Sequence, residues 1–170
     1  MTIEEHDDGG DLHVHAGGQG LWQARLLEAF DVQATMCAVL LGETGAVLKY
    51  LLREHEGVDV VAIERDGRGA AYVHDRRDGK RDAVMETPGD ALTRHDVDEL
   101  YNAALRLGLE RDATILSGPA GEGVVPDEVY ARLAADLRTA GRMVIADLSG
   151  DRLNAVLEGG LHLLLSLIHI

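Results

Sequence analysis

Ala-Gly-Gly-Gln-Gly, at residues 16–20, lies between a strand-like segment at 12–15 and a helix-like segment at 21–30. Glycines at such a junction allow the backbone to approach a ligand closely and to adopt dihedral angles that other residues avoid. The helix that follows offers unpaired N–H groups and the positive end of its dipole. The pattern favours a site for a polar or anionic small molecule, and a tight turn without a ligand is the alternative reading.

Two common phosphate-binding loops do not fit these glycines. A P-loop ends in Gly-Lys followed by Ser or Thr, and this triplet does not occur in the sequence. A dinucleotide fingerprint that starts at Gly18 and uses Gly20 requires Gly or Ala at position 23, where the chain has Gln23. The glycines therefore indicate a different kind of site.

Length and charge restrict the class of protein. The chain has 170 residues, enough for one domain, and its net charge is −14 because 30 acidic residues outnumber 16 basic ones. This charge argues against binding to nucleic acid or to an anionic membrane. The longest apolar run, at 161–170, is too short to span a bilayer. Cys37, the single cysteine, lies in an apolar run, which predicts a buried, unreactive thiol in a cytoplasmic protein.

Short apolar strands alternate with amphipathic helices along the chain. This alternation predicts an α/β fold with a parallel sheet covered by helices. Segments 70–74 and 83–86 form a predicted hairpin, and we expect 10–16 and 58–86 to leave the main layer as a small antiparallel lid. The other predicted strands are 32–41, 113–116, 143–148 and 161–165, and the predicted helices cover 21–30, 44–54, 93–105, 126–140 and 153–158. Thr44 is the expected N-cap of the second helix, and Thr93 and Asp96 predict a capping box at the start of the third.

Four glycine-bearing loops follow predicted strands, and together they resemble the ribokinase/PfkB family of ATP-dependent sugar kinases. The matching segments are Ala-Gly-Gly-Gln-Gly-x-x-x-Ala-Arg at 16–25, Gly-Glu-Thr-Gly at 42–45, Leu-Ser-Gly-Pro at 116–119 and Asp-Leu-Ser-Gly at 147–150. The pattern is most similar to the 1-phosphofructokinase-like branch. The resemblance implies a ribokinase-like fold, ATP and Mg²⁺ as cofactors, and a sugar or sugar phosphate as substrate. It also implies a homodimer formed through the lid.

The resemblance assigns the first loop to the substrate. Gly17, Gly18 and Gly20 would lie against the sugar. Gln19 stands where many members have a Lys, so a charge suited to a substrate phosphate is absent. Trp22 stands where most members have an Asn that binds sugar hydroxyls, and it would either stack on a sugar face or belong to the core.

The later loops supply the other expected site residues. Ser117 and Gly118 would line the substrate pocket, and Asp147 would lie on the side of the nucleotide and the metal ion. The Gly-Ala-Gly-Asp segment that carries the family's catalytic Asp does not occur in these 170 residues. We therefore name no catalytic residue and expect this chain alone to be inactive.

Both ends of the chain suggest a partial domain. Met1 falls late in the family's first hairpin, and residues 1–164 correspond to the amino-terminal half of a PfkB-type kinase domain, so the carboxyl-terminal half is expected to be missing. Leu-Ser-Leu-Ile-His-Ile at 165–170 is what CTGTCTCTTATACACATC encodes, the mosaic end of a transposon used in sequencing libraries. We interpret 165–170 as translated adapter.

Two other functions remain open from the sequence. His13 and His15 lie on one face of a strand, so a metal-dependent hydrolase is conceivable if His74, Asp75 or Asp147 completes the ligand set. A non-catalytic sugar-binding or dimerisation module is the second alternative, because the chain lacks the catalytic segment.

Overall fold

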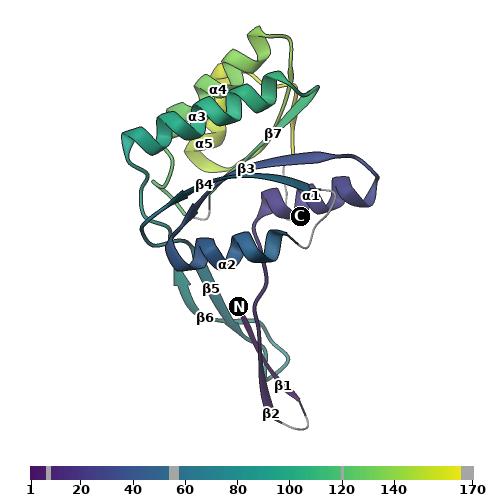
Figure 1. Cartoon of the computed structure of the whole chain (residues 1–170), viewed down its shortest axis with the longest axis vertical. Helices are drawn as coiled ribbons and strands as arrows, with labels where there is room; N and C mark the ends of the chain where they lie inside the picture. Colours follow the sequence, from purple (N-terminus) through teal and green to yellow (C-terminus); the bar gives the residue numbers. More distant parts are fainter. Residues whose placement is uncertain (7–8, 54–57, 120, 166–170) are drawn as a thin grey trace.

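The computed structural model describes residues 1–6, 9–53, 58–119 and 121–165. It consists of a layered helical part and a sheet that projects from it (Figure 1). The predictions for 166–170 and for the helix end at Glu54 lie outside the described residues.

The layered part contains two groups of parallel strands. β3 (Ala34–Leu41) pairs with β4 (Val58–Arg65) over their whole length, from Ala34 opposite Val58 to Leu41 opposite Arg65. β7 (Ala113–Ser117), β8 (Met143–Asp147) and β9 (Leu163–Leu164) form a second parallel group in the order β7-β8-β9. Parallel pairing brings the carboxyl ends of neighbouring strands to one edge, which is where ligands bind in open α/β sheets.

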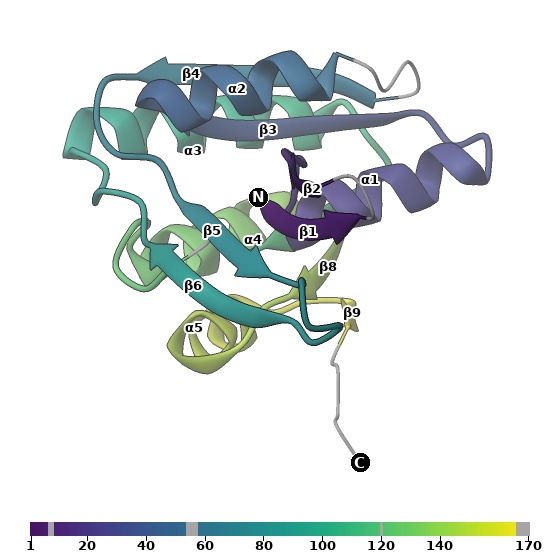
Figure 2. The ribbon, with the colours of Figure 1, turned by 90° about the horizontal axis from the view of Figure 1, so that it is seen from below.

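Five helices of the described part of the chain cover these strands. α1 (Gln19–Ala29) and α2 (Gly42–Leu52) lie on one side of β3 and β4, and α3 (Arg94–Leu109) lies on the other side (Figures 1 and 2). α4 (Asp127–Thr139) and α5 (Gly150–Gly159) pack with α3 over β7 and β8. Leu137, Val144 and Val156 are the largest fully buried side chains, so the main core lies between these helices and β8.

The projecting sheet has the strand order β2-β1-β5-β6. Its strands are β1 (Thr2–His6), β2 (Gly9–His13), β5 (Ala71–Asp75) and β6 (Asp82–Thr87). The predicted hairpin is present as the antiparallel pair β5–β6. A parallel sheet with covering helices and a small β sheet beside it is the expected ribokinase-like architecture, and the prediction of the fold class is confirmed.

Several expected boundaries differ from the structure. β4 pairs with β3 in the parallel layer, so the segment 58–65 is not part of the projecting sheet, contrary to the expected lid range 58–86. β1 and β5 are parallel, so this sheet is not wholly antiparallel. β2 ends at His13, and residues 14–18 form the connection to α1, because backbone pairing with β1 stops there.

Of the two N-caps expected from the sequence, the one at α3 is present and the one at α2 is not. The predicted capping box of α3 is present: Thr93 accepts from the Asp96 N–H, and Asp96 accepts from the Thr93 N–H at 3.2 Å. α2 instead begins at Gly42, so Thr44 is inside its first turn and does not cap it. The Thr44 hydroxyl donates back to the Leu41 carbonyl at 3.4 Å. Within the described part of the chain, no helix is long and apolar enough to cross a membrane.

Candidate functional site

The glycine loop reaches α1 through an unusual backbone conformation. Gly18 precedes the helix with φ 111°, and no side chain caps the exposed N–H groups of the first turn. Leu21 and Ala24 are buried and hold α1 against the layer below. Gly20 brings the loop close to the end of β7, since an added Cβ there would be in ordinary contact, at 3.6 Å, with both Cβ and Oγ of Ser117.

The ends of β7 and β8 carry two of the predicted site residues side by side. Ser117 and Asp147 are register partners in the parallel pair. α1 places a glutamine over both of them: Ser117 Oγ donates to Gln23 Oε1 at 2.7 Å, and Gln23 Nε2 donates to Asp147 Oδ2 at 2.5 Å. Gln19 Nε2 lies 3.5 Å from Asp147 Oδ1, one helical turn earlier. We call these four side chains the glutamine network.

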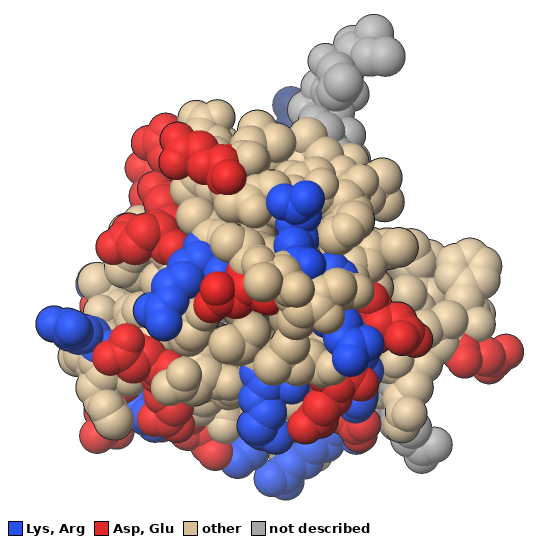
Figure 3. Space-filling model, turned by 90° about the horizontal axis from the view of Figure 1, so that it is seen from above, with Lys and Arg blue, Asp and Glu red and all other residues tan. Residues whose placement is uncertain are grey.

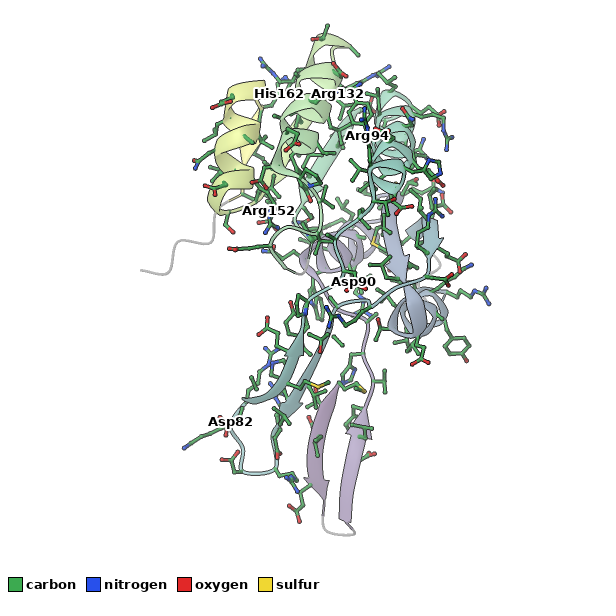
Figure 4. The ribbon with its side chains drawn as sticks, turned by 90° about the vertical axis from the view of Figure 1, so that its left-hand side faces the viewer. Asp82, Asp90, Arg94, Arg132, Arg152 and His162 are labelled. Atoms are coloured by element: carbon green, nitrogen blue, oxygen red, sulfur yellow. The ribbon has the colours of Figure 1, made fainter. Side chains whose placement is uncertain are left out.

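Gly118 lies against an arginine of α5. A Cβ at this position would lie 2.8 Å from Arg152 Nη1. The guanidinium donates to the carbonyls of Pro119 and Gly121 at 3.4 and 3.3 Å, and its Nε lies 3.8 Å from Asp127 Oδ1. Figure 4 shows Arg152 at the end of α5 nearest the projecting sheet. Arg152 therefore supports the loop after β7 through its carbonyl groups.

Trp22 is not a core residue. Its side chain is 61% exposed, and the Arg25 guanidinium stacks over the ring at 5.0 Å from its centroid. The core alternative considered for Trp22 is therefore wrong, because residues 21 and 24 supply the buried face of α1 and position 22 points away from it. Trp22 borders a shallow cavity of about 180 Å³ between α1 and the segment that follows β2, lined by Val14, His15, Ala16, Trp22, Arg25 and Leu51.

The histidine pair does not form a metal centre with the residues proposed for it. The rings of His13 and His15 stack at 5.8 Å, and His13 Nε2 lies 3.4 Å from Asp11 and 3.9 Å from Glu4. Asp147 is bound by glutamines at the end of β8. Among the described residues, no group of three or more His, Cys, Asp or Glu side chains could hold a metal ion.

The surface charge is mixed in spite of the large net charge. On the face seen from above in Figure 1, acidic and basic side chains alternate over short distances (Figure 3). Several basic residues are paired with acids, including Lys49 with Glu64 at 2.5 Å and Arg77 with Asp75 at 2.6 Å. This pattern is typical of a solvated surface and not of a phosphate-backbone interface.

Known proteins are similar to this chain in sequence and in fold, although no family model matches it. The 1-phosphofructokinase of Vibrio cholerae is 28% identical over 151 residues, which are 88% of this chain and 46% of that protein. Phosphofructokinase-2 from Escherichia coli, solved in complex with fructose-6-phosphate, is 26% identical with a TM-score of 0.73 over 96% of this chain and 56% of that one.

The chain is therefore similar in sequence and in fold to the ribokinase/PfkB-like sugar kinases. A possible 1-phosphofructokinase from Thermotoga maritima, 18% identical, has the same fold with a TM-score of 0.74 over 94% of this PfkB-like chain and 52% of its own. The PfkB-like chain spans about half the length of the curated relative that it matches.

The structure places three of the loops that the sequence analysis selected, at 16–20, 117–118 and 147, near one another, but the sequence analysis missed a residue that links them. Gln23 was considered only as a mismatch to a dinucleotide motif, yet it contacts both Ser117 and Asp147. A signal was available, because Gln19 and Gln23 are four residues apart and such residues share one face of a helix. Arg152 gave no comparable signal, since its partners are carbonyl groups of a loop distant in sequence.

Proposed function

We propose that this chain forms the sugar-binding part of an enzyme that transfers a phosphoryl group from ATP to a hydroxyl group of a sugar or sugar phosphate. The observation that carries the proposal is the approach of the glycine loop at 16–20 to the paired strand ends at Ser117 and Asp147. The similarity to a 1-phosphofructokinase and to a phosphofructokinase-2 supports the same reaction class.

The glycine loop offers space and donors for the sugar. A Cβ at Gly17 or Gly18 would meet no other atom within 4 Å, so the backbone there is open to a ligand. The uncapped N–H groups at the start of α1 can donate to sugar oxygens. In this proposal Gly17, Gly18, Gln19, Gly20, Ser117 and Gly118 contact the substrate.

Trp22 supplies a second element of the proposed site. An exposed aromatic ring beside a cavity is suited to stacking against the apolar face of a sugar ring. Arg25 holds the Trp22 ring from one side, so one orientation of the indole is favoured before a ligand arrives.

ATP and Mg²⁺ are part of the proposal for the whole enzyme. Phosphoryl transfer depends mainly on positioning and on stabilising charge on the phosphoryl oxygens, and the metal ion bound to the phosphates supplies part of that stabilisation. Asp147 is the expected carboxylate on the nucleotide side, but both its oxygens accept from glutamine amides. These residues do not form a metal site by themselves, and we assign no step to the ion.

Two further features belong to the proposal. The projecting sheet exposes Leu12, Val84 and Met85, which is consistent with a lid that also forms a homodimer. We place the enzyme in the cytoplasm, with its single cysteine, Cys37, in the reduced form.

Binding of a sugar panel to the purified 170-residue chain tests the proposal. We expect a chemical-shift change at the amides of 17–20 and 117–118 with a cognate sugar or sugar phosphate, and no ATP-dependent phosphorylation, because the Gly-Ala-Gly-Asp segment is absent. Gly18→Val should abolish binding, since φ 111° is unfavourable for a side chain that would also fill the open approach.

Gly17→Ala is the matched control because it adds only a methyl group in the same open loop, at a residue without a positive φ. We expect it to weaken binding much less than Gly18→Val does. Unchanged binding in Gly18→Val would remove the loop from the site. Sugar phosphorylation by the chain alone would contradict the expected lack of catalysis.

A further inference from the structure

The parallel group of β7, β8 and β9 is covered unequally on its two faces. Val144 and Ala146 of β8 are fully buried in the core that α3, α4 and α5 form with this strand. Side chains alternate along a strand, so Met143 and Ile145 point to the opposite face. Met143 is 49% exposed and Ile145 is only partly buried, although β8 is the middle strand of its group. The described residues therefore leave this second face partly uncovered.

An apolar row crosses all three strands on this second face. Ile145 has Ile115 as its register partner in β7 and Leu163 as its register partner in β9. Register partners on neighbouring strands point to the same face of a sheet. Leu163 is 50% exposed, and Ile115 is only partly buried. The exposed apolar surface thus extends from β7 to β9.

α1 lies on the same face as this row. Ser117 and Asp147 follow the row by two residues in β7 and β8, and the alternation of side chains brings them to its face. Gln23 of α1 binds both of these side chains. Figure 1 shows the same arrangement, with α3, α4 and α5 above β3 and β4 and α1 below them.

The side of α1 that carries Gln23 becomes apolar further along the helix. Gln19, Gln23, Leu26 and Phe30 follow one another at helical spacing, so they share one side of α1. Leu26 is 59% exposed, and Phe30, directly after the helix, is 70% exposed. These two side chains extend the apolar row beyond the sheet. We call the combined surface the open face; its residues are Leu26, Phe30, Ile115, Met143, Ile145 and Leu163.

The related kinases contain enough further chain to cover the open face. Parallel sheets in α/β proteins have helices on both faces, and a continuous exposed apolar surface marks an interaction site. The match covers 46% of the Vibrio cholerae 1-phosphofructokinase and 56% of phosphofructokinase-2 from Escherichia coli, so about half of each relative lies outside it. A second copy of this chain is the alternative cover, but each copy has a net charge of −14, which opposes self-association.

We propose that the open face is a docking surface for the part of a PfkB-like kinase that this chain does not span, and that this part binds here even as a separate chain. Leu26 and Phe30 are the anchors of this interface, because they are the exposed apolar side chains that border the sheet from α1. The proposal concerns assembly and goes beyond the proposed reaction.

Co-production with a complementary chain tests the docking surface. The complement is the part of the Vibrio cholerae 1-phosphofructokinase outside the 151 matched residues, produced in the same cell as the 170-residue chain. Phe30→Cys, in a Cys37→Ala background that removes the native thiol, reports coverage through its rate of thiol labelling. Leu157→Cys is the matched control, because Leu157 is 52% exposed on α5, which covers the other face.

We expect both thiols to label rapidly in the 170-residue chain alone. In the purified complex, Phe30→Cys should lose its rapid labelling and Leu157→Cys should keep it. Phe30→Asp should weaken the complex roughly hundredfold, as expected for an anchor residue of an interface, and Leu157→Asp should leave the affinity unchanged. If the separate complement is insoluble, the same two chains joined by a flexible linker decide the test through the labelling rates.

Three results would overturn the docking surface. These are rapid labelling of Phe30→Cys in the linked protein, a complex that tolerates Phe30→Asp as well as Leu157→Asp, and slow, concentration-dependent labelling of Phe30→Cys in the chain alone, which would assign the open face to a second copy. Sugar binding and ATP-dependent phosphorylation are measured separately. A protected Phe30→Cys without sugar binding would reject only the proposed function, and sugar binding with an unprotected Phe30→Cys would reject only the docking surface.

Discussion

Arg65, the last residue of β4, donates through Nε to Asp96 Oδ1 at 2.6 Å. Asp96 also closes the capping box of α3 with Thr93, and its side chain is largely buried. The carboxylate of Asp96 therefore contacts both the last residue of β4 and the N-terminus of α3, the helix that covers this layer. Because the segments 58–65 and 94–109 are separated by the projecting hairpin, this contact holds the two layers together across that insertion.

Disruption of this contact should destabilise the fold in a graded way. Thr93→Ala removes the side-chain cap of α3 and should lower the free energy of unfolding by about 1 kcal/mol. Asp96→Ala should cost more, because it also removes one of the two carboxylates that bind Arg65 and leaves only Glu99. Urea unfolding measures both effects, with Asp98→Ala, an exposed acid in the same helical turn, as the control. Equal losses for Thr93→Ala and Asp96→Ala would contradict a role for the ion pair.

Protonation of two aspartates, Asp96 and Asp75, should lower the free energy of unfolding in acid. The Thr93 hydroxyl and then Arg65 lower the pKa of Asp96, and hydrogen bonds from Arg77 lower the pKa of Asp75 to about 2. A carboxyl group whose pKa is lower in the folded state stabilises the fold at pH values above its unfolded pKa of about 4. This stabilisation is lost as the pH falls through the pKa of the folded state. The free energy of unfolding should therefore decrease below about pH 4.

The variant Asp96→Asn isolates one part of this pH dependence. It keeps the shape of the side chain but cannot titrate, so the slope of stability against pH below about pH 4 should become smaller. Urea midpoints measured in steps between pH 6 and pH 2 give the slope, with Asp98→Asn as the control. An unaltered slope in Asp96→Asn would show that other groups dominate acid unfolding.

Gly45 allows α2 to start directly beside β3. A Cβ at this position would lie 2.7 Å from the backbone carbon of Leu40, which cannot rotate away as a side chain would. We expect Gly45→Ala to destabilise the chain by about 1–2 kcal/mol, because the clash outweighs the helix preference of alanine. Gly17→Ala adds a methyl group in open space and should leave the unfolding midpoint unchanged. A stabilised Gly45→Ala variant would show that α2 shifts without cost.

Leu137 and Leu26 provide a comparison between the core and the surface. Leu137 is fully buried in α4 and contacts the core around β8, while Leu26 is 59% exposed on α1. Leu137→Ala should lower the free energy of unfolding by about 2–5 kcal/mol through lost burial and an unfilled cavity. Leu26→Ala should change it by less than about 0.5 kcal/mol. A large loss at Leu26 would reveal that its side chain is covered in solution.

Cys37 should react slowly with thiol reagents. Burial in β3 raises the pKa of its thiol, and Arg106 opposes this effect only in part. Since the thiolate is the reactive form, labelling at neutral pH should be slower than that of an unfolded control and should accelerate as the pH rises. The same chain in urea gives the control rate. Fast labelling in the folded chain would contradict burial of the thiol.

The sequence predicted those parts of the fold that depend on local patterns. The capping box at Thr93 and Asp96 was identified because its two hydrogen bonds connect residues three positions apart. The hairpin β5–β6 was identified from two strand-like segments around a polar turn. The prediction for 58–65 was wrong, because an apolar strand before a hairpin can pair with either sheet, and the choice depends on β3, which is distant in the sequence.

The alternation of strands and helices, the glycine loop at 16–20 and the likeness to sugar kinases could be predicted, because they depend on spacing and residue type along the chain. The folded chain was needed to see that Ser117 and Asp147 are register partners, that Gln23 joins them, and that Trp22 is exposed. The physical reason is that hydrogen bonds between side chains more than 90 positions apart depend on how α1 is placed over β7 and β8, which packing alone decides.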